Sequence, residues 1–249
     1  MHESVLEVSG LTRRFGATTA LDSVTLSLPR GAVYGLVGAN GAGKTTLIRH
    51  MLGLLRPDRG SVRVFGLDPV ADPVAVLSRI GYLSEENDLP AWMRVDELVR
   101  YSRAFYPTWD DGYAEELRRA FALDPAAKIK NLSRGQRART GLLLALAYRP
   151  ELLVLDEPSS GLDPIVRRDI LGAVIRTIAD EGRTVLFSSH LLEEVEQVAD
   201  HLTLIHQGRI VLSAPLDAVR EAHRVGERLP SLAEIFVAHV GTPARAPDA

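Results

Sequence analysis

A glycine-rich segment that directly follows an apolar run constrains the fold more than any other feature of this sequence. Residues 32–37 (AVYGLV) are almost entirely apolar, which is typical of a central strand buried on both faces of a sheet. Residues 38–45 (GANGAGKT) come next, and the apolar residues of 45–55 then recur at helical spacing. A strand, the pattern Gly-x-x-x-x-Gly-Lys-Thr and a helix, in this order, predict a phosphate-binding loop.

The residue types in this segment suit a bound nucleotide. Glycines let backbone N–H groups curl around phosphate oxygens, and the start of the helix adds partial positive charge. We expect Lys44 to neutralise the β- and γ-phosphates of ATP and the Thr45 hydroxyl to bind Mg²⁺. Lys44 is one of only three lysines among 29 basic residues, which argues against a turn that merely joins strand to helix. The predicted nucleotide-binding residues here are Gly38, Asn40, Gly41, Gly43, Lys44, Thr45 and Thr46.

Two further apolar strands end in polar side chains. Asp156 and Glu157 follow the strand 152–155, and His190 follows the strand 184–188. Open parallel sheets bind ligands at the carboxyl ends of their strands. We expect Asp156 to hold Mg²⁺, Glu157 to orient and deprotonate the water that attacks the γ-phosphate, and His190 to contact that phosphate. Taken alone, an acidic pair after a strand is often a solvated loop or helix cap, and a lone histidine is more often structural.

The order of strand and helix patterns predicts an α/β fold. Residues 5–8 and 21–28 alternate apolar and polar side chains, as in half-exposed antiparallel strands, whereas buried strands alternate with helices after residue 152. Amphipathic helices dominate residues 87–150. We therefore expect a P-loop NTPase (RecA-like) core with a mainly parallel sheet, an N-terminal antiparallel β subdomain and an inserted α-helical subdomain. These form one domain over residues 1–240, and residues 241–249 are expected to be a loose tail.

Composition excludes several classes of protein. The net charge of −3 provides no basic field for nucleic acid, and the absence of cysteine excludes disulfides, thiol catalysis and cysteine-ligated metals. The longest apolar run, residues 141–148, is far shorter than the roughly 18 residues that span a bilayer. The first residues lack the pattern of a secretory signal. We expect a cytoplasmic protein whose membrane role, if any, is exercised through a partner.

Two more motifs connect the sequence to a known family. They are residues 132–137 (LSRGQR) and residues 160–163 (SGLD). With the glycine-rich loop, the acidic pair and His190, they occur in the order that is typical of ATP-binding cassette (ABC) ATPases. The sequence resembles this family from about Leu6 to Val240. Many nucleotidases have the phosphate loop, but the Leu-Ser-x-Gly-Gln signature makes the resemblance specific.

The resemblance implies an active site shared by two subunits. In the family, residues of the signature contact the γ-phosphate bound by the other protomer, and they match Ser133 and Gly135 here, with Gln136 beside them. Asp163 matches a loop that communicates across the interface. Phe15 matches the aromatic residue that stacks on adenine, although an ordinary buried phenylalanine is the alternative. Two cassettes would then enclose two ATP molecules. A monomer is expected to hydrolyse ATP poorly.

The sequence departs from the family pattern at two positions. Arg134 replaces the first glycine of the signature, where the family tolerates bulk. Glu85 occupies the place of a glutamine that helps to position Mg²⁺ and the attacking water. A carboxylate can ligate the metal, but it adds negative charge near the phosphates. Glu86 serves instead if the register is shifted by one residue.

The implied function is that of the ATP-binding and ATP-hydrolysing subunit of an ABC transporter. The expected partners are integral-membrane permease subunits and a second ABC ATPase subunit, identical or different, with the chain at the inner face of the cell membrane. Glu85 and the short end after residues 231–236 resemble exporter-type cassettes. Residues 89–93, which include Trp92, are the candidate contact with the permease, unless these aromatic residues only fill the helical subdomain.

Two other functions stay open at this point. One is a soluble ABC ATPase that acts on the ribosome or on nucleic acid, although such relatives usually carry two cassettes, coiled coils or basic arms. The other is a regulatory cassette that binds ATP without turnover, against which Glu157 and His190 argue. The transported cargo is not identified by the sequence, because cargo specificity resides in the membrane subunits.

Overall fold

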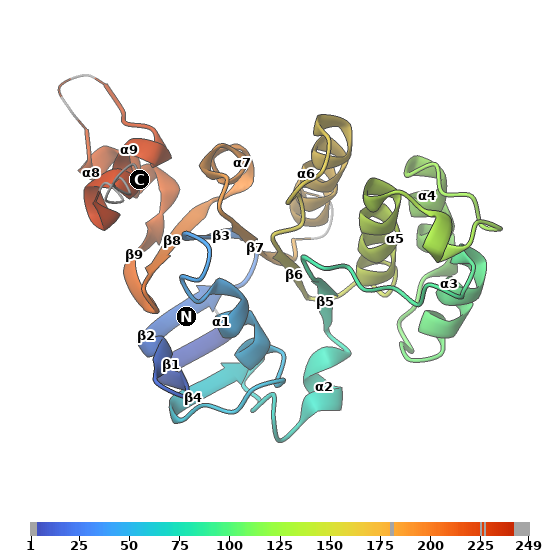
Figure 1. Ribbon diagram of the computed structural model, residues 1–249, viewed down its shortest axis with the longest axis horizontal. Coiled ribbons are helices and arrows are strands. Elements are labelled where there is room, and N and C mark those ends of the chain that lie inside the picture. Colours follow the sequence, from blue (N-terminus) through green and yellow to red (C-terminus); the bar gives the residue numbers. More distant parts are fainter. Residues whose placement is uncertain (1–3, 180–181, 225, 227, 242–249) are drawn as a thin grey trace, which may run out of the picture.

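The computed structural model of the protein describes residues 4–179, 182–224, 226 and 228–241. It has two sheets, a smaller antiparallel one and a larger, mainly parallel one, with helices on both sides of the larger sheet (Figure 1). Of the expected tail, residues 241–249, Gly241 caps the last helix and residues 242–249 lie outside the described residues. Within the described part, no helix has the length and apolar character needed to cross a membrane.

The smaller sheet is formed by the N-terminal strands. Its order is β2-β1-β4, and β1 pairs antiparallel with both neighbours. The strands are β1 (Ser4–Phe15), β2 (Thr18–Pro29) and β4 (Arg59–Val64). The alternating residues predicted at 21–28 do bury their apolar side chains, Leu21, Val24, Leu26 and Leu28. The antiparallel N-terminal unit is therefore confirmed.

The larger sheet has the order β5-β6-β7-β3-β8-β9, in which only β9 runs antiparallel to its neighbour. Its strands are β3 (Val33–Val37), β5 (Ile80–Leu83), β6 (Leu152–Asp156), β7 (Thr184–Ser189), β8 (His201–His206) and β9 (Arg209–Pro215). Every residue of β3, β6 and β7 is buried. This agrees with the continuous apolar runs of the sequence and confirms the predicted α/β fold class.

The central strands are buried throughout because the larger sheet has a core on each face. Along β6, Leu153 and Leu155 pack in one core with the helices that follow β5, whereas Leu152 and Val154 pack in the other with α1 and the smaller sheet. Figure 1 shows α6 and α7 on one side of the larger sheet and α1 with the smaller sheet on the other. Neither face of these strands can therefore carry exposed polar residues.

The segment between β5 and β6 contains only helices among its regular elements. These are α3 (Val95–Arg103), α4 (Asp111–Ala120), the 3₁₀ helix η1 (Ile129–Asn131) and α5 (Arg134–Leu146). They gather at the β5 end of the sheet, away from α1 (Figure 1). The other helices are α1 (Lys44–Met51), the unpredicted short α2 (Pro73–Leu77), α6 (Pro164–Ala179), α7 (Leu192–Val198), α8 (Leu216–Ala222) and α9 (Leu232–Val240).

The strand register brings three strand ends together. Val37 of β3 is level with Ser189 of β7, and Asp156 of β6 is level with Ser188. The glycine-rich loop, the acidic pair and His190 therefore leave the sheet at the same edge, because parallel neighbours present their carboxyl ends on one side.

Gly35 sets the distance between this sheet and helix α7. A Cβ atom at Gly35 would lie 2.3 Å from Cγ1 of Val195 and 3.2 Å from Cβ of Ala199. Val195 is fully buried, so it has no free space in which to move aside. The absence of a side chain at position 35 thus lets α7 pack closely against β3.

We predict that Gly35→Ala destabilises the protein by about 1–3 kcal/mol, because the added methyl group overpacks this contact. Val195→Ala also destabilises it, by opening a cavity. The double variant should lose less free energy of unfolding than the two single variants together, because the smaller side chain on α7 makes room for the methyl group added on β3. Urea unfolding of the four proteins checks this. Strictly additive free energies of unfolding would show that the close contact is not the source of the loss.

Candidate functional site

The glycine-rich loop adopts backbone conformations that favour glycine. Gly41 has a φ of 78° and Gly43 a φ of 111°, both in the left-handed region that other residues avoid. At Gly38 a Cβ atom would lie 2.4 Å from the carbonyl oxygen of Ile205, at the end of the neighbouring strand β8. The loop is thus shaped by three of its predicted residues. Asn40, at its tip, is exposed, and Thr45 and Thr46 stand on the first turn of α1.

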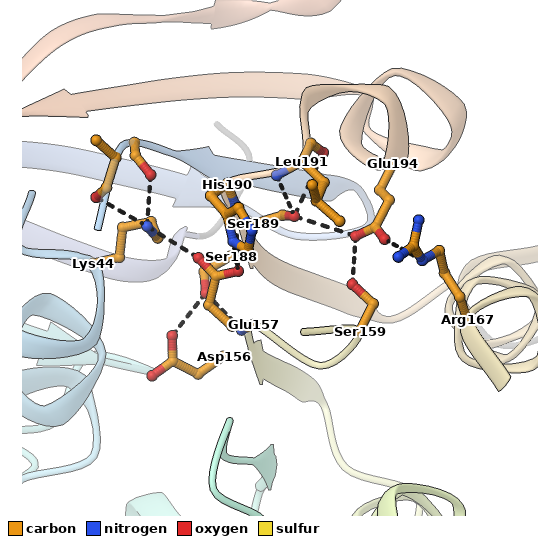
Figure 2. Close-up of polar contacts among 12 residues, drawn as sticks. Lys44, Asp156, Glu157, Ser159, Arg167, Ser188, Ser189, His190, Leu191 and Glu194 are labelled. Atoms are coloured by element: carbon orange, nitrogen blue, oxygen red, sulfur yellow. Dashed lines mark hydrogen bonds and ion pairs between the residues drawn. The ribbon is translucent and has the colours of Figure 1, made fainter. Parts of the chain in front are cut away.

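Lys44 lies inside the loop, where two hydrogen bonds and an ion pair hold its ammonium group. Its Nζ donates to the carbonyl oxygens of Gly38, at 2.6 Å, and Ala39, at 3.2 Å, and pairs with Oε1 of Glu157 at 3.0 Å (Figure 2). Both charged side chains are only 6% exposed. Two of the three donors of the ammonium group are therefore used on carbonyl oxygens, and its charge is paired with the carboxylate of Glu157. A phosphate group that enters the loop competes with Glu157 for this charge.

Residues at the end of β7 and directly after it hold both the backbone and the carboxylate of Glu157. Its backbone N–H donates to the carbonyl oxygen of Ser188, at 3.2 Å, and to the Ser188 hydroxyl, at 3.0 Å. Its carboxylate Oε2 lies 2.6 Å from Nδ1 of His190. Glu157 has a φ of 49°, which is strained for a residue with a side chain and is typical of functional positions. The carboxylate therefore has one oxygen on Lys44 and the other on His190.

Asp156 lies beside this pair and is almost fully buried. The Ser188 hydroxyl donates to its Oδ1 at 2.7 Å. Burial raises the pKa of Asp156, and the charges of Glu157 and Glu85 raise it further, against the hydrogen bonds from Ser188 and Thr45. A carboxylate whose charged form is disfavoured in this way gains from a nearby cation.

These groups fit the requirements of Mg²⁺. Thr45 and Asp156, the two predicted ligands from the loop and from β6, interact directly. Among the described residues, no group of three or more His, Cys, Asp or Glu side chains is arranged to hold a metal. Mg²⁺ usually binds through one or two protein oxygens together with substrate phosphates and water, so a full set of protein ligands is not needed.

Phe15 stands at the end of β1, and 46% of its surface is exposed. It is therefore not an ordinary core phenylalanine. The guanidinium of Arg13 lies over the ring, 4.7 Å from its centroid, and is itself held by a carboxylate oxygen of Asp58 at 3.0 Å. One face of the ring is covered by a cation.

The signature residues are not close to the glycine-rich loop of the same chain. Ser133 caps helix α5: its hydroxyl accepts the Gln136 N–H at 3.1 Å, and the Gln136 side chain accepts the Ser133 N–H at 2.9 Å. At Gly135 a Cβ atom would lie 2.6 Å from Cγ2 of Val166 on α6. In Figure 1, α5 lies with the helices at the β5 end of the larger sheet, away from α1, and the two helices pack in different cores. The sequence motifs thus form two separate groups.

The side chain of Asp163 caps the N-terminus of α6. Its Oδ1 accepts the backbone N–H groups of Ile165 and Val166, both at 3.0 Å. The cap uses only Oδ1 of the carboxylate, so Oδ2 is available for a contact with another subunit.

The two departures from the family pattern line the same cleft, which has a volume of about 590 Å³. Its lining includes Glu85, Glu86 and Arg134. Arg134 packs against Gly161, where a Cβ atom would lie 2.4 Å from its Nη1. Glu85 acts on Asp156 through its charge.

Sequence reasoning missed a buried carboxylate behind His190. Glu194 of α7 is 2% exposed and contacts Ser159, Ser189 and Arg167. Its position contained a signal. Glu194 follows Leu191 by three residues and precedes Val198 by four, so it falls on the apolar face of its helix.

A mainly parallel sheet with a glycine-rich loop, an acidic pair and a histidine at one edge defines a P-loop nucleotide-binding domain. The sequence profile described as ABC transporter matches residues 21–160. The chain belongs to the ABC transporter family, and it is of the ATP-binding subunit type.

Relatives from bacteria support this assignment. The bacitracin transport ATP-binding protein BcrA of Bacillus licheniformis is 31% identical over 223 residues, which cover 89% of this chain and 73% of that protein. The daunorubicin/doxorubicin resistance ATP-binding protein DrrA of Streptomyces peucetius is 38% identical over 214 residues, which cover 83% of this chain. The chain spans 64% of the length of DrrA.

Solved structures have the same fold. The ATP-binding subunit of an ABC transporter superposes with a TM-score of 0.84 at 29% identity, covering 94% of this chain and 98% of that chain. The cassette MJ0796, a dimer bound to ADP and phosphate, superposes with a TM-score of 0.75 at 21% identity, covering 85% of this chain and 98% of its own. At 21% identity, the similarity to MJ0796 establishes the fold alone.

The raised pKa of Asp156 gives a prediction about stability. Relative to the ordinary value of 3.8, the folded chain holds this proton more tightly than the unfolded chain, so stability falls as the pH rises through the raised pKa. We expect Asp156→Asn, measured without nucleotide or Mg²⁺, to raise the Tm by a few degrees at pH 7.5 and by less at acidic pH. A Tm at pH 7.5 equal to or below that of the wild type would contradict this.

Glu151, which directly precedes β6, provides a control because its pKa is shifted in the opposite direction. Hydrogen bonds from Arg79 and then Arg30 lower the pKa of Glu151 to about 2. Its ionised form therefore stabilises the fold above the ordinary value of 4.5, and this contribution is lost as the pH falls toward 2. Glu151→Gln should lower the Tm at pH 7.5.

Proposed function

We propose that this protein hydrolyses ATP and that the hydrolysis drives transport, in the direction of export, through separate integral-membrane subunits. The observation that carries the proposal is the placement of Glu157 between Lys44 and His190, with Asp156 adjacent. A buried carboxylate that is oriented by a histidine and lies next to a phosphate-binding lysine is suited to act as a general base.

The contacts suggest how ATP binding prepares the base. The glycine-rich loop and Lys44 would hold the β- and γ-phosphates. Because phosphate charge competes with Glu157 for the ammonium group of Lys44, the phosphates would draw Nζ away from Glu157, and Oε1 would become free to accept a proton. Oε2 stays on His190, so the carboxylate keeps its orientation. Mg²⁺, held by Thr45 and Asp156 with help from the charge of Glu85, would neutralise phosphate charge.

Hydrolysis then needs one water molecule. The water oxygen bonds to the γ-phosphorus, the bond from that phosphorus to the oxygen of ADP breaks, and Glu157 takes a proton from the water. That proton later leaves to solvent. His190, which is already bound to Glu157 at one ring nitrogen, would present its other side to the phosphate that departs. Phe15 would stack on adenine, in competition with Arg13 for the ring face that Arg13 covers.

The separation of the two motif groups supports a shared active site. Ser133 is exposed at the N-terminus of the 13-residue helix α5, a position that favours negative ligands. Helix α5, which Ser133 caps, lies away from α1, whose first residue is Lys44 (Figure 1). We infer that Ser133, Gly135 and Gln136 complete the site of a second ABC ATPase subunit, identical or related, and that Asp163 faces the same interface.

The proposed permease contact lies between the sheet and the helical segment. Trp92 is 72% exposed, whereas Met93 next to it is buried, so of the candidate residues 89–93 the tryptophan is available to a partner. A groove of about 390 Å³ nearby is lined by Leu54, Tyr82, Leu89 and Tyr106, among others. Exposed aromatic residues are frequent anchors at interfaces. Docking here would hold the protein at the cytoplasmic face of the membrane.

Transport is better supported than the soluble alternative. The relatives are named as ATP-binding proteins of bacitracin transport and of drug resistance. They favour export, in line with Glu85. A role on the ribosome or on nucleic acid has no such support, and the net charge of −3 does not favour a nucleic-acid partner.

We predict that Glu157→Gln lowers the rate of phosphate release at least ~100-fold, the usual effect of losing a general base. ATP binding should persist, because Lys44 and the loop are unchanged, and the variant should elute as a dimer in the presence of ATP. Phosphate release, nucleotide titration and size-exclusion chromatography measure the three effects. Glu151→Gln, at the opposite end of the same strand, is the matched control. Release by Glu157→Gln at the wild-type rate would rule out the assigned base.

A further inference from the structure

We propose that Glu194 is a positioning residue that holds the loops after β6 and β7 in register, and so fixes the geometry of Glu157 and His190. The role rests on the hydrolysis proposed above. Glu194 has no recorded hydrogen bond or ion pair with these two residues, and it lies on α7, on the side of His190 away from Lys44 (Figure 2).

One oxygen of Glu194 joins the two loops. Ser159 donates its hydroxyl proton to Oε2 at 2.6 Å, and Ser189 donates to the same oxygen at 3.2 Å. Ser159 stands two residues after Glu157, and Ser189 directly precedes His190. The carboxylate therefore fixes the chain on both sides of the Glu157–His190 contact.

The bond from Ser189 is oriented by the backbone. The Ser189 hydroxyl oxygen accepts the N–H of Leu191 at 2.9 Å, which leaves its proton free to point elsewhere. From the Ser189 hydroxyl oxygen, the Leu191 carbonyl oxygen lies at 3.4 Å, whereas Oε2 of Glu194 lies closer, at 3.2 Å. A charged acceptor also makes the stronger bond. The proton thus goes to Glu194.

The other oxygen of Glu194 is paired with α6. Nε of Arg167 lies 3.0 Å from Oε1, and the Glu194 side chain is 3% exposed. A carboxylate at this depth is costly unless a cation and hydrogen bonds compensate it. Arg167 supplies the cation, and the two serines supply the hydrogen bonds.

Helix α6 extends the network to the signature. Val166, adjacent to Arg167, is the residue that packs against Gly135. A continuous series of contacts therefore runs from the signature through α6 and Glu194 to the two loops that carry Glu157 and His190. Energetic coupling between sites can travel through contacts of this kind. Glu194 is placed to relay a subunit contact at one site to the catalytic pair of the other.

The test is Glu194→Gln, which keeps the shape of the side chain and removes its charge. Glu196→Gln is the matched control, because Glu196 lies on the same helix and pairs with Arg220, at 3.3 Å, and with the N–H of Leu232, at 2.6 Å, away from the site. We expect kcat to fall at least ~10-fold in Glu194→Gln, since small displacements of catalytic groups are costly. KM for ATP should stay within about twofold, because Glu194 does not touch the nucleotide.

A spectroscopic measurement separates positioning from loss of folded protein. The chain has seven histidines, so ¹⁵N labelling of histidine rings gives few signals, and His190→Gln identifies the one from His190. Glu194→Gln should shift the His190 signal, whereas Glu196→Gln should not. Ser189→Ala removes one hydroxyl without burying a charge, and it should shift the same signal even if Glu194→Gln folds poorly.

The outcomes are distinct. An unmoved His190 signal in Ser189→Ala and Glu194→Gln, or a loss of kcat that Glu196→Gln shares, overturns the role of Glu194. A wild-type protein that releases no phosphate, or a Glu157→Gln variant that releases it normally, overturns the proposed hydrolysis instead. In that case the ring signals still report whether Glu194 positions His190.

Discussion

Lys44 and Glu157 form an ion pair inside the protein, and the arrangement of the site follows from the need to hold it. Removing either partner alone would leave a buried charge unpaired, at a cost of about 3–5 kcal/mol. The fold compensates both charges with further polar contacts, from the loop carbonyl groups to Lys44 and from His190 to Glu157. Because phosphate oxygens compete for the same ammonium group, the pair that stabilises the site is also the pair that nucleotide binding must rearrange.

This pair exists only because three strand ends are level. The glycine-rich loop leaves β3, Glu157 leaves β6 and His190 leaves β7, and β7 lies between the other two strands. Ser188, at the end of β7, binds both Asp156 and the Glu157 backbone. The middle strand therefore positions the acidic pair. The signature lies outside this cluster on α5, which is why we propose that a second subunit completes the site.

Local sequence patterns predicted the central strands, the glycine-rich loop and the polar residues at the strand ends. The loop 38–45 is contiguous in sequence, and β3, β6 and β7 are continuous apolar runs, so their identity and the chemistry at their ends could be inferred without the structure. The antiparallel start was also predicted, although β1 extends to Phe15 rather than ending near residue 8, because polar residues beyond that point still pair with β2. Helix α2 has only five residues, too few for a helical period to be visible.

Long-range contacts were the part that could not be predicted. The strand order depends on pairing between distant segments. The partners of Glu194 come from positions 35 and 5 residues away and from α6, so no local pattern joins them. Likewise, nothing in the sequence indicates that Arg13 covers Phe15, or that the departures at Glu85 and Arg134 meet in one cleft.

We propose that each active site takes Glu157 from one subunit and Ser133 from another. Mixing two inactive variants tests it most directly, since Glu157→Gln keeps an intact signature and Ser133→Arg keeps an intact base. After subunit exchange, half of the dimers are mixed and each contains one complete site, so phosphate release should recover to about a quarter of the wild-type rate. If mixed dimers form, as shown by two affinity tags, and release stays at the sum of the separate variants, the shared site is contradicted.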